Sequence, residues 1–472
     1  MKHYLTREQQ ILLVSSGVLV FGLYVAPSLS GLMRLVFKFL IGRLKRLKKS
    51  QQNYIQVGGL KINDDSRLRH THILGSTGSG KSVLIEQLLF QDLERGQGAI
   101  IIDAKGDRAF YQRVKRFCTQ LGRGSDLSLL STSHIQESAL WNPCRLGSPS
   151  ELQSKFFGAA RYEESFYAKA VESALIRAFQ NISAKELNLL TLNDLVSELK
   201  TLTKDGRDEN LKGVYFDFDN LSRSDWAPLF GLTKKSGIQK EVSFLDVVRK
   251  NEILFIDLPT EGQKVQSERV GRLLLQEILL LSGLRKRFPH LKSGRPFSVY
   301  IDEFDAFATP SFISFLNKGR SSEFMIHMAH QTLSDLKLVH PDFEGQLIGN
   351  TNCRFFFRVD LPDDAEKCAL IIGTKKVTKT TSQIKDGAST GMGTIRETQE
   401  FIAHPDQIKN LKVGECVVSI KTQNLSQFIQ IPFIENHSFG AYQQLVHREA
   451  LTLKLSSIKS EPFSEFQIEE IN

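Results

Sequence analysis

Gly75-Ser76-Thr77-Gly78-Ser79-Gly80-Lys81-Ser82 fits the pattern G-x-x-x-x-G-K-[ST]. The residues before it, His72-Ile73-Leu74, can end a β-strand, and residues 83–89 after it have the apolar spacing of a helix. In this setting the glycines let backbone N–H groups point inward, and the helix adds the positive end of its dipole, so that both attract phosphate oxygens. The sequence therefore predicts a nucleotide-binding loop at residues 75–82.

Two side chains at the end of this loop predict specific contacts. In loops of this pattern the lysine reaches the β- and γ-phosphates, and the final hydroxyl holds Mg²⁺. We therefore expect ATP and Mg²⁺ as cofactors, with Lys81 as a catalytic residue and Ser82 as a magnesium ligand. The expected nucleotide-binding residues are Gly75, Ser76, Thr77, Gly78, Ser79, Gly80, Lys81 and Ser82.

A second strand follows the helix of this loop. Ala99-Ile100-Ile101-Ile102 is a short apolar run, typical of a parallel strand buried on both faces, and the residues from 108 to 118 look helical. Strand, helix, strand and helix in this order predict an α/β fold. Asp103 directly follows the strand, at the edge where α/β sheets bind ligands. A catalytic carboxylate and a helix-capping aspartate both fit this position.

An acidic pair ends a strand two hundred residues later. Residues 297–301 (FSVYI) are rich in β-formers and lead into Asp302 and Glu303. Because the chain already carries a phosphate loop, this pair indicates a Walker B element. We expect Asp302 to hold Mg²⁺ through its water shell, and Glu303 to orient and deprotonate the water that attacks ATP.

A third strand candidate, residues 324–329, leads into His330 and Gln331. Gln331 is well placed to sense the γ-phosphate from the neighbouring strand tip. Arg320 stands eleven residues before Gln331 and could act as an arginine finger on the nucleotide of the next subunit. A solvated surface arginine fits the same spacing.

The apolar spacing becomes helical between the two halves of the predicted ATPase, for example over residues 168–179 and 187–202. We therefore predict an all-α insertion. The expected division is 1–50 for the anchor and its basic segment, 51–149 for the first part of the nucleotide-binding domain, 150–235 for the insertion, 236–436 for the second part and 437–472 for the C-terminal tail.

Two segments near the end of the chain carry further expectations. Residues 378–394, rich in glycine, threonine and serine, are expected to form a mobile loop between two closing strands. The last dozen residues hold four glutamates and no basic residue. This short acidic tail is either a solvated end or a docking site for a basic partner.

The N-terminus predicts a membrane anchor. Ile11 to Leu29 is a run of nineteen residues without a charge, close to the ~20 needed to cross a bilayer. Residues 31–42 are amphipathic and could lie at the interface or form the second arm of a short hairpin. The basic run 43–49 follows, so the positive-inside rule places the rest of the chain in the cytoplasm.

Charge and cysteine content limit the functional classes. The formal net charge is +9, of which residues 1–50 carry +8. The excess basicity therefore belongs beside the membrane and is no evidence for a DNA-coating surface. The five cysteines are scattered without metal-ligand spacing, which suits a reducing compartment and argues against a disulfide framework or a zinc site.

With these motifs placed, the chain resembles the coupling proteins of type IV secretion and conjugation systems, the TraD/TraG family within the FtsK–HerA class of ring ATPases. The resemblance covers the chain from the anchor to the closing strands. It rests on the order and spacing of GSTGSGKS at 75–82, IDAKGD at 102–107, WNP at 141–143, YIDEF at 300–304, GRS at 319–321 and AHQ at 329–331.

The resemblance implies a RecA-like P-loop NTPase core with an inserted all-α domain, anchored in the bacterial inner membrane with its bulk in the cytoplasm. It also implies a homo-hexamer that moves single-stranded DNA and its relaxase to the type IV secretion channel. Arg320 is then the implied finger and Gln331 the implied sensor. The chain departs from the family in its single clear span, in Ala104 where the family usually has proline, and in its short acidic tail.

The leading hypothesis is a membrane-anchored, ATP-driven DNA translocase of conjugation. One alternative is an FtsK/HerA-type translocase of chromosomal or repair DNA, and another is a membrane DNA receptor or adaptor that hydrolyses ATP weakly. An ABC transporter subunit is disfavoured, because no LSGGQ-like signature precedes Asp302. The sequence contains no base-reading motif, so we expect contacts to DNA phosphates that are independent of sequence.

Overall fold

The structure is a computed structural model that describes residues 52–160, 165–183, 190–204, 211–231, 240–385 and 388–433. The expected membrane anchor and basic segment over residues 1–50 lie outside the described residues, as does the acidic tail over residues 437–472. Within the described ranges, no helix combines the length and the apolar character needed to cross a membrane.

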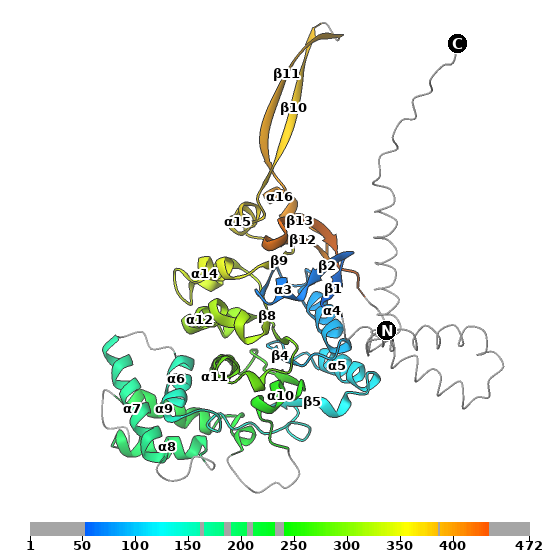
Figure 1. The fold of residues 1–472 in the computed structure, drawn as a ribbon. Coiled ribbons are helices and arrows are strands. Elements are labelled where there is room, and N and C mark those ends of the chain that lie inside the picture. The colour runs from blue at the N-terminus through cyan, green and yellow to red at the C-terminus, as the bar shows by residue number, and fades with distance from the viewer. Residues whose placement is uncertain are drawn as a thin grey trace, which may run out of the picture.

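A nine-stranded sheet forms the centre of the molecule, in the order β13-β12-β9-β3-β8-β7-β4-β6-β5 (Figure 1). The strands from β9 to β5 in this order are parallel, whereas β12 and β13 are antiparallel to their neighbours. The bounds are β3 (Thr71–Leu74), β4 (Ala99–Asp103), β5 (Leu127–Ser131), β6 (Ile253–Asp257), β7 (Phe297–Ile301), β8 (Phe324–His330), β9 (Cys353–Phe356), β12 (Glu415–Ile420) and β13 (Leu425–Gln430).

Helices cover both faces of this sheet, which explains why strands such as β4 are almost entirely apolar. In β4, Ile100 and Ile102 belong to the core under one face, and Ala99 and Ile101 belong to the core under the other. One face carries α4 (Lys81–Glu94), α5 (Arg108–Gln120) and the hairpin of β1 (Tyr54–Val57) and β2 (Leu60–Asn63). The other carries α10 (Phe244–Lys250), α11 (Lys264–Arg287), α12 (Pro310–Gly319) and α14 (Phe343–Asn350).

A group of helices stands to one side of the sheet, where the sequence predicts an insertion. They are α6 (Pro149–Ala159), α7 (Ser165–Ser183), α8 (Leu192–Leu202) and α9 (Lys212–Ser222). A capping box fixes the start of α6, because Ser148 accepts from the Glu151 N–H while the Glu151 side chain accepts from the Ser148 N–H. Helix α6 packs against α11, which joins this group to the sheet-bearing part of the molecule.

The expectation of a mobile loop at residues 378–394 is wrong. β10 (Thr374–Lys385) and β11 (Ala388–Phe401) pair as an antiparallel ribbon, with a register shift between Ser382 and Ile384. The ribbon projects from the body between α15 (Pro362–Ile372) and α16 (Pro405–Lys409) (Figure 1). Its threonines, valine and isoleucines favour extended backbone, and this outweighs the glycines that suggested a loop.

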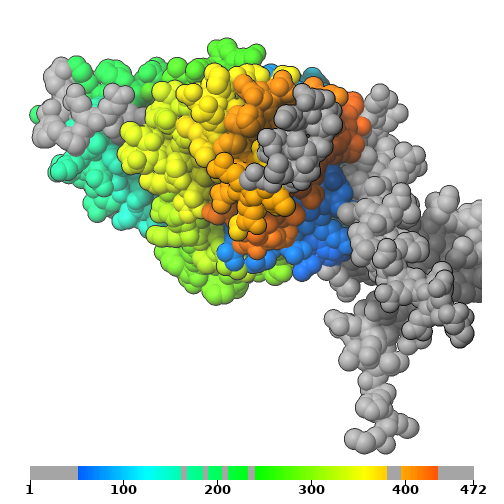
Figure 2. All heavy atoms as spheres, turned by 90° about the horizontal axis from the view of Figure 1, so that it is seen from above, coloured from blue at the N-terminus to red at the C-terminus, as the bar shows by residue number. Residues whose placement is uncertain are grey.

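Short helices complete the described chain. They are α3 (Asp64–Arg67), which follows β2, and α13 (Leu333–Lys337), which follows β8. The view onto the ribbon end shows that α6–α9 and the hairpin of β1 and β2 lie on opposite sides of the body (Figure 2).

Candidate nucleotide-binding site

The predicted phosphate loop connects the end of β3 to the start of α4. Gly78 and Gly80 have φ angles of 73° and 119°, in the left-handed region that favours glycine. A Cβ on Gly75 would lie 2.5 Å from Cβ of Phe357, and one on Gly80 would lie 3.2 Å from the backbone of Gly414. Close contacts therefore favour glycine at positions 75 and 80, and backbone conformation favours it at positions 78 and 80.

Lys81 lies inside the curl of the loop. Its Nζ donates to the carbonyl oxygens of Gly75 at 2.5 Å and Ser76 at 3.1 Å. Burial lowers the pKa of Lys81 to about 8, although the nearby Asp302 carboxylate opposes this shift. Among the described residues, the buried hydroxyls of Ser76 and Ser79 have no hydrogen-bond partner. The loop therefore offers a buried cation and two orphaned hydroxyls, a set that fits phosphate oxygens.

The acidic pair predicted as Walker B lies beside this loop. Ser82 Oγ donates to Asp302 Oδ2 at 3.2 Å, so the structure joins two residues that are 220 positions apart. Glu303 has a φ of 49°, an uncommon conformation for a residue with a side chain. Its backbone N–H donates to Asp302 Oδ1 at 3.1 Å. The turn after β7 thus directs two adjacent carboxylates to the same edge of the sheet.

Gln331 bridges the loop and the acidic pair. It follows the last residue of β8, the strand that lies between β3 and β7. Thr77 Oγ1 donates to Gln331 Oε1 at 3.0 Å, and Gln331 Nε2 donates to Glu303 Oε1 at 3.3 Å. The structure therefore brings the predicted sensor into contact with both the phosphate loop and the predicted base.

Lys105 is a site residue that the sequence reasoning did not single out. Its Nζ forms an ion pair with Asp302 Oδ2 at 2.7 Å and donates to Ser82 Oγ at 2.9 Å. Burial by itself would lower the pKa of Lys105, but the nearby carboxylates, Asp302 first among them, together raise it. The sequence did contain an indication that Lys105 belongs to the site, because this residue follows a predicted strand by two positions, at the end of the strand where ligands are expected to bind.

The oxygens of Ser82 and Asp302 also fit the expected magnesium ion. A hydroxyl and a carboxylate are ligands that Mg²⁺ accepts, and it usually takes one or two protein carboxylates together with phosphates and water. Here the same two oxygens already share one positive group, the ammonium of Lys105. Their spacing and chemistry are therefore suited to holding a cation.

Asp103 has its two carboxylate oxygens engaged by the turn that follows it. Oδ1 accepts from the Lys105 N–H at 3.2 Å, and Oδ2 accepts from the Asp107 N–H at 2.8 Å. Burial raises the pKa of Asp103 to about 7, with a further contribution from Asp302. The cap of α5 is Asp107, which accepts from the Ala109 N–H. Asp103 therefore shapes the turn that carries Lys105 and does not cap the helix.

Arg320 does not approach the phosphate loop of its own chain. It precedes β8, whereas Gln331 follows that strand, so the two residues lie at opposite ends of β8. The seven residues of β8 alone span roughly 20 Å at about 3.3 Å per residue. Arg320 is exposed and forms an ion pair with Asp65 at 2.9 Å.

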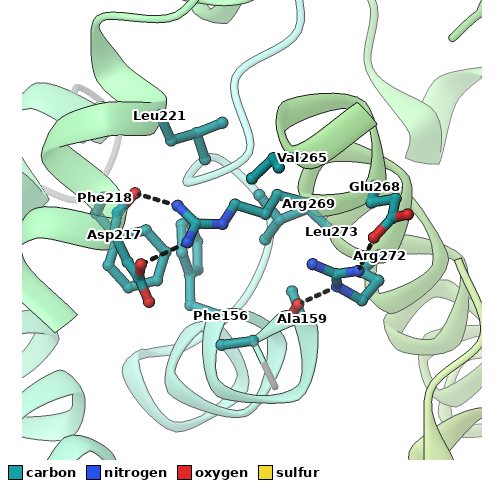
Figure 3. A pocket seen from close by; sticks show the side chains of 11 residues that line it. Phe156, Ala159, Asp217, Phe218, Leu221, Val265, Glu268, Arg269, Arg272 and Leu273 are labelled. Atoms are coloured by element: carbon teal, nitrogen blue, oxygen red, sulfur yellow. Dashed lines mark hydrogen bonds and ion pairs between the residues drawn. The ribbon is translucent and has the colours of Figure 1, made fainter. Parts of the chain in front are cut away.

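A separate cavity of about 240 Å³ lies between α6, α9 and α11 (Figure 3). Two arginines point toward it, and each has an acidic partner there: Arg269 pairs with Asp217, and Arg272 pairs with Glu268. Apolar side chains, including Phe156 and Phe218, line the rest. Because both charges are balanced locally, the lining residues that the structure describes present no unpaired ionic group to a ligand.

Two family models match the chain. The model described as the TraM recognition site of TraD and TraG matches residues 296–413, which include the acidic pair, Arg320 and Gln331. The model described as the type IV secretion-system coupling protein DNA-binding domain matches residues 54–123, which include the phosphate loop. Both halves of the site therefore fall within sequence patterns of coupling proteins.

Among curated proteins, the type 4 coupling protein DotL of Legionella pneumophila subsp. pneumophila is 24% identical over 447 residues. The match covers 76% of this chain, and the chain spans 57% of the length of DotL.

Solved structures share the fold. The unbound monoclinic form of the bacterial conjugative coupling protein TrwB has a TM-score of 0.62 and 18% identity, with 83% of this chain and 91% of that chain covered. TrwB in complex with ADP and Mg²⁺ has a TM-score of 0.61 and 18% identity, with 83% and 92% covered. VirB4 of Thermoanaerobacter pseudethanolicus has a TM-score of 0.52 and 15% identity, with 78% and 90% covered.

These likenesses confirm the predicted α/β NTPase fold. The two family models and DotL add a likeness in sequence to that likeness in fold. In sequence patterns and in fold, this chain is similar to the coupling proteins of type IV secretion systems.

Proposed function

We propose that this chain is the ATP-hydrolysing motor of a type IV secretion system, which couples a relaxase–DNA complex to the secretion channel during conjugative transfer. The observation that carries the proposal is the 3.2 Å contact between Ser82 Oγ and Asp302 Oδ2. This contact joins the phosphate loop to the acidic strand tip, as a site for one magnesium–nucleotide complex requires. The likeness to TrwB, which has been solved with ADP and Mg²⁺, supports the same proposal.

In this proposal the loop residues bind the nucleotide and the acidic pair serves hydrolysis. Lys81 exchanges the carbonyl oxygens of Gly75 and Ser76 for phosphate oxygens, which attract an ammonium more strongly than neutral carbonyls do. Ser82 and Asp302 would hold Mg²⁺, which when bound neutralises charge on the phosphates. Glu303 accepts the proton of the attacking water.

Gln331 contacts both the phosphate loop and the acidic pair. Its amide contacts Thr77 in the loop and Glu303 at the tip of the neighbouring strand. A nucleotide that shifts the loop would therefore change the hydrogen bonding of the carboxylate that we assign as the base. This arrangement supports a role as a sensor of the γ-phosphate.

We further propose that the motor is a homo-hexamer and that Arg320 acts on the nucleotide of the adjacent subunit. Its exposed position at the sheet edge opposite to the chain's own site supports a role across a subunit boundary. The substrate in this proposal is single-stranded DNA held through its phosphates, without sequence preference. The proposed location is the bacterial inner membrane, with residues 11–29 as the anchor.

The likeness to coupling proteins favours this function over chromosomal or repair translocation by an FtsK/HerA-type motor. A weakly hydrolysing DNA receptor or adaptor has no specific observation in its favour, because Lys81, Asp302, Glu303 and Gln331 meet at one edge of the sheet.

The test is the ATP turnover of the full chain, purified in detergent, with and without single-stranded DNA. We expect the DNA to stimulate turnover and Lys81→Ala to abolish it while the protein stays folded. Lys115→Ala is a matched control, because Lys115 is an exposed lysine on α5 that pairs with Glu137. Full turnover in Lys81→Ala would refute the ATPase assignment, and turnover that ignores DNA would refute the motor.

A further inference from the structure

The ammonium of Lys105 lies where a metal ion would also bind. Its ammonium contacts Asp302 Oδ2 at 2.7 Å and Ser82 Oγ at 2.9 Å, and these are the two oxygens that fit Mg²⁺. We propose that Lys105 is a built-in counter-ion of the nucleotide site, which competes with the divalent cation for these two oxygens. This inference rests on the proposed function, because it concerns the same site.

The backbone around Lys105 is held firmly, so its placement is built into the fold. Asp103 accepts from the N–H groups of Lys105 and Asp107. The Ala104 carbonyl oxygen accepts from the Thr260 N–H at 3.0 Å and from the Thr260 hydroxyl at 3.1 Å. The turn is therefore attached both to its own strand tip and to the loop after β6.

The side chain of Lys105, in contrast, has room to move. It is 36% exposed, whereas the Asp302 side chain is 8% exposed. A lysine has a flexible stem of four methylene groups and a compact charge, so its ammonium can leave while its backbone stays in place. A fixed backbone and a partly exposed ammonium are the features that a displaceable counter-ion needs.

The physical reason for such a residue is the buried carboxylate of Asp302. A buried charge without a partner is strongly destabilising, so some cation must accompany Asp302 in every state of the site. Lys105 supplies that cation from within the chain. Because two positive groups at the same two oxygens repel each other, Mg²⁺ has to displace the ammonium as it binds, and the apparent affinity for Mg²⁺ is reduced.

The experiment uses the full chain and titrates Mg²⁺ at a fixed concentration of ADP, with nucleotide binding followed by isothermal calorimetry or a fluorescent ADP analogue. Lys105→Met keeps most of the side-chain volume and removes the charge. We expect it to lower the half-saturating Mg²⁺ concentration about tenfold, a change of about 1.4 kcal/mol. Lys105→Arg keeps the charge and should stay within about threefold of the wild type, a difference of less than 1 kcal/mol.

Two controls separate this effect from general electrostatics and from misfolding. Lys115→Met removes the same charge from an exposed pair on α5 and should leave the half-saturating Mg²⁺ concentration unchanged. Lys105→Gln retains a hydrogen-bond donor for Asp302 and Ser82, so it replaces Lys105→Met if that variant does not fold. Its expected shift has the same direction.

A second readout needs no nucleotide. Thermal unfolding with Mg²⁺ and with a chelator should show a larger stabilisation by Mg²⁺ in Lys105→Met than in the wild type. An unchanged or higher half-saturating Mg²⁺ concentration in a folded neutral variant would overturn the inference and show that the pair only supports the local structure. If the wild type does not bind ADP even at saturating Mg²⁺, the proposed function fails, and the unfolding experiment still decides the role of Lys105.

Discussion

Gln331 Nε2 donates a hydrogen bond of 3.3 Å to Glu303 Oε1, and this bond joins the tips of two adjacent strands beside the phosphate loop. The oxygen of the same amide accepts from Thr77. Residues from the loop, from the end of β7 and from the end of β8 therefore form one continuous polar chain. The group that we assign as the base is connected to the group that we assign as the sensor without an intervening residue.

Glu303→Gln tests the role of the base. An amide keeps the size of the side chain but cannot accept a proton from water, so we expect ATP to bind while hydrolysis slows by at least about 100-fold. Single-turnover hydrolysis and the ATP dissociation constant should be measured on the same preparation. Asp305→Asn is the matched control, because burial raises the pKa of this nearby carboxyl to about 6 yet we assign it no role in proton transfer. Equal slowing in both variants would contradict the assignment.

Arg320→Ala tests action across a subunit boundary. Because Arg320 lies at the opposite edge of the sheet from its own site, we expect DNA-stimulated turnover to fall at least tenfold while basal turnover changes little. Lys318→Ala, a neighbouring exposed cation, should behave as the wild type. Stimulated turnover that is unaffected by Arg320→Ala, under conditions where the oligomer forms, would make Arg320 a surface residue.

Mixed oligomers sharpen this test. Lys81→Ala subunits keep a normal Arg320, and Arg320→Ala subunits keep a normal phosphate loop. If the arginine serves the neighbouring site, mixing the two impaired variants before assembly should restore part of the stimulated turnover. If the stimulated turnover of the mixtures never exceeds the sum measured for the separate variants, the two residues act in the same site.

The sequence was sufficient to predict the local elements of the site. A phosphate loop between a strand and a helix, and an acidic pair at a strand tip, are short patterns whose geometry depends on neighbouring residues. Parallel strands then bring their carboxyl ends to one edge, so the meeting of Ser82, Asp302 and Gln331 could be expected before the strand order was known.

Other contacts between distant side chains could not be predicted. Lys105 reaches Asp302 only because β4 and β7 are neighbours in the sheet. A buried ion pair between Arg67 and Asp92 depends likewise on how α3 packs on α4. The β10–β11 ribbon was missed for another reason, since it lies outside the core and its sequence lacks the apolar alternation that marks a buried strand.

Asp103→Asn should change how stability depends on pH. Burial raises the pKa of Asp103 to about 7, above its value of about 4 in the unfolded chain, so folding favours the protonated form. The contribution of Asp103 to stability is therefore complete below about pH 4 and is lost as the pH rises toward 7.

The free energy of unfolding of the wild type should accordingly decrease, relative to that of Asp103→Asn, between about pH 4.5 and pH 7.5. Urea denaturation at three pH values in this window measures the difference. A difference between the two proteins that does not vary with pH would show that Asp103 is ionised throughout the window in the folded state.

The most direct measurement for the whole account is a double-mutant cycle of Ser82→Ala and Asp302→Asn, read out as the Mg²⁺-dependent part of ADP affinity. If both residues hold one magnesium–nucleotide complex, each single variant weakens the Mg²⁺-dependent part of the affinity. The double variant then weakens it by less than the product of the two single-variant factors, with a coupling of at least about 1 kcal/mol. Effects that simply multiply, within about 0.5 kcal/mol, would mean that the two segments act independently, and the proposed nucleotide site would be contradicted.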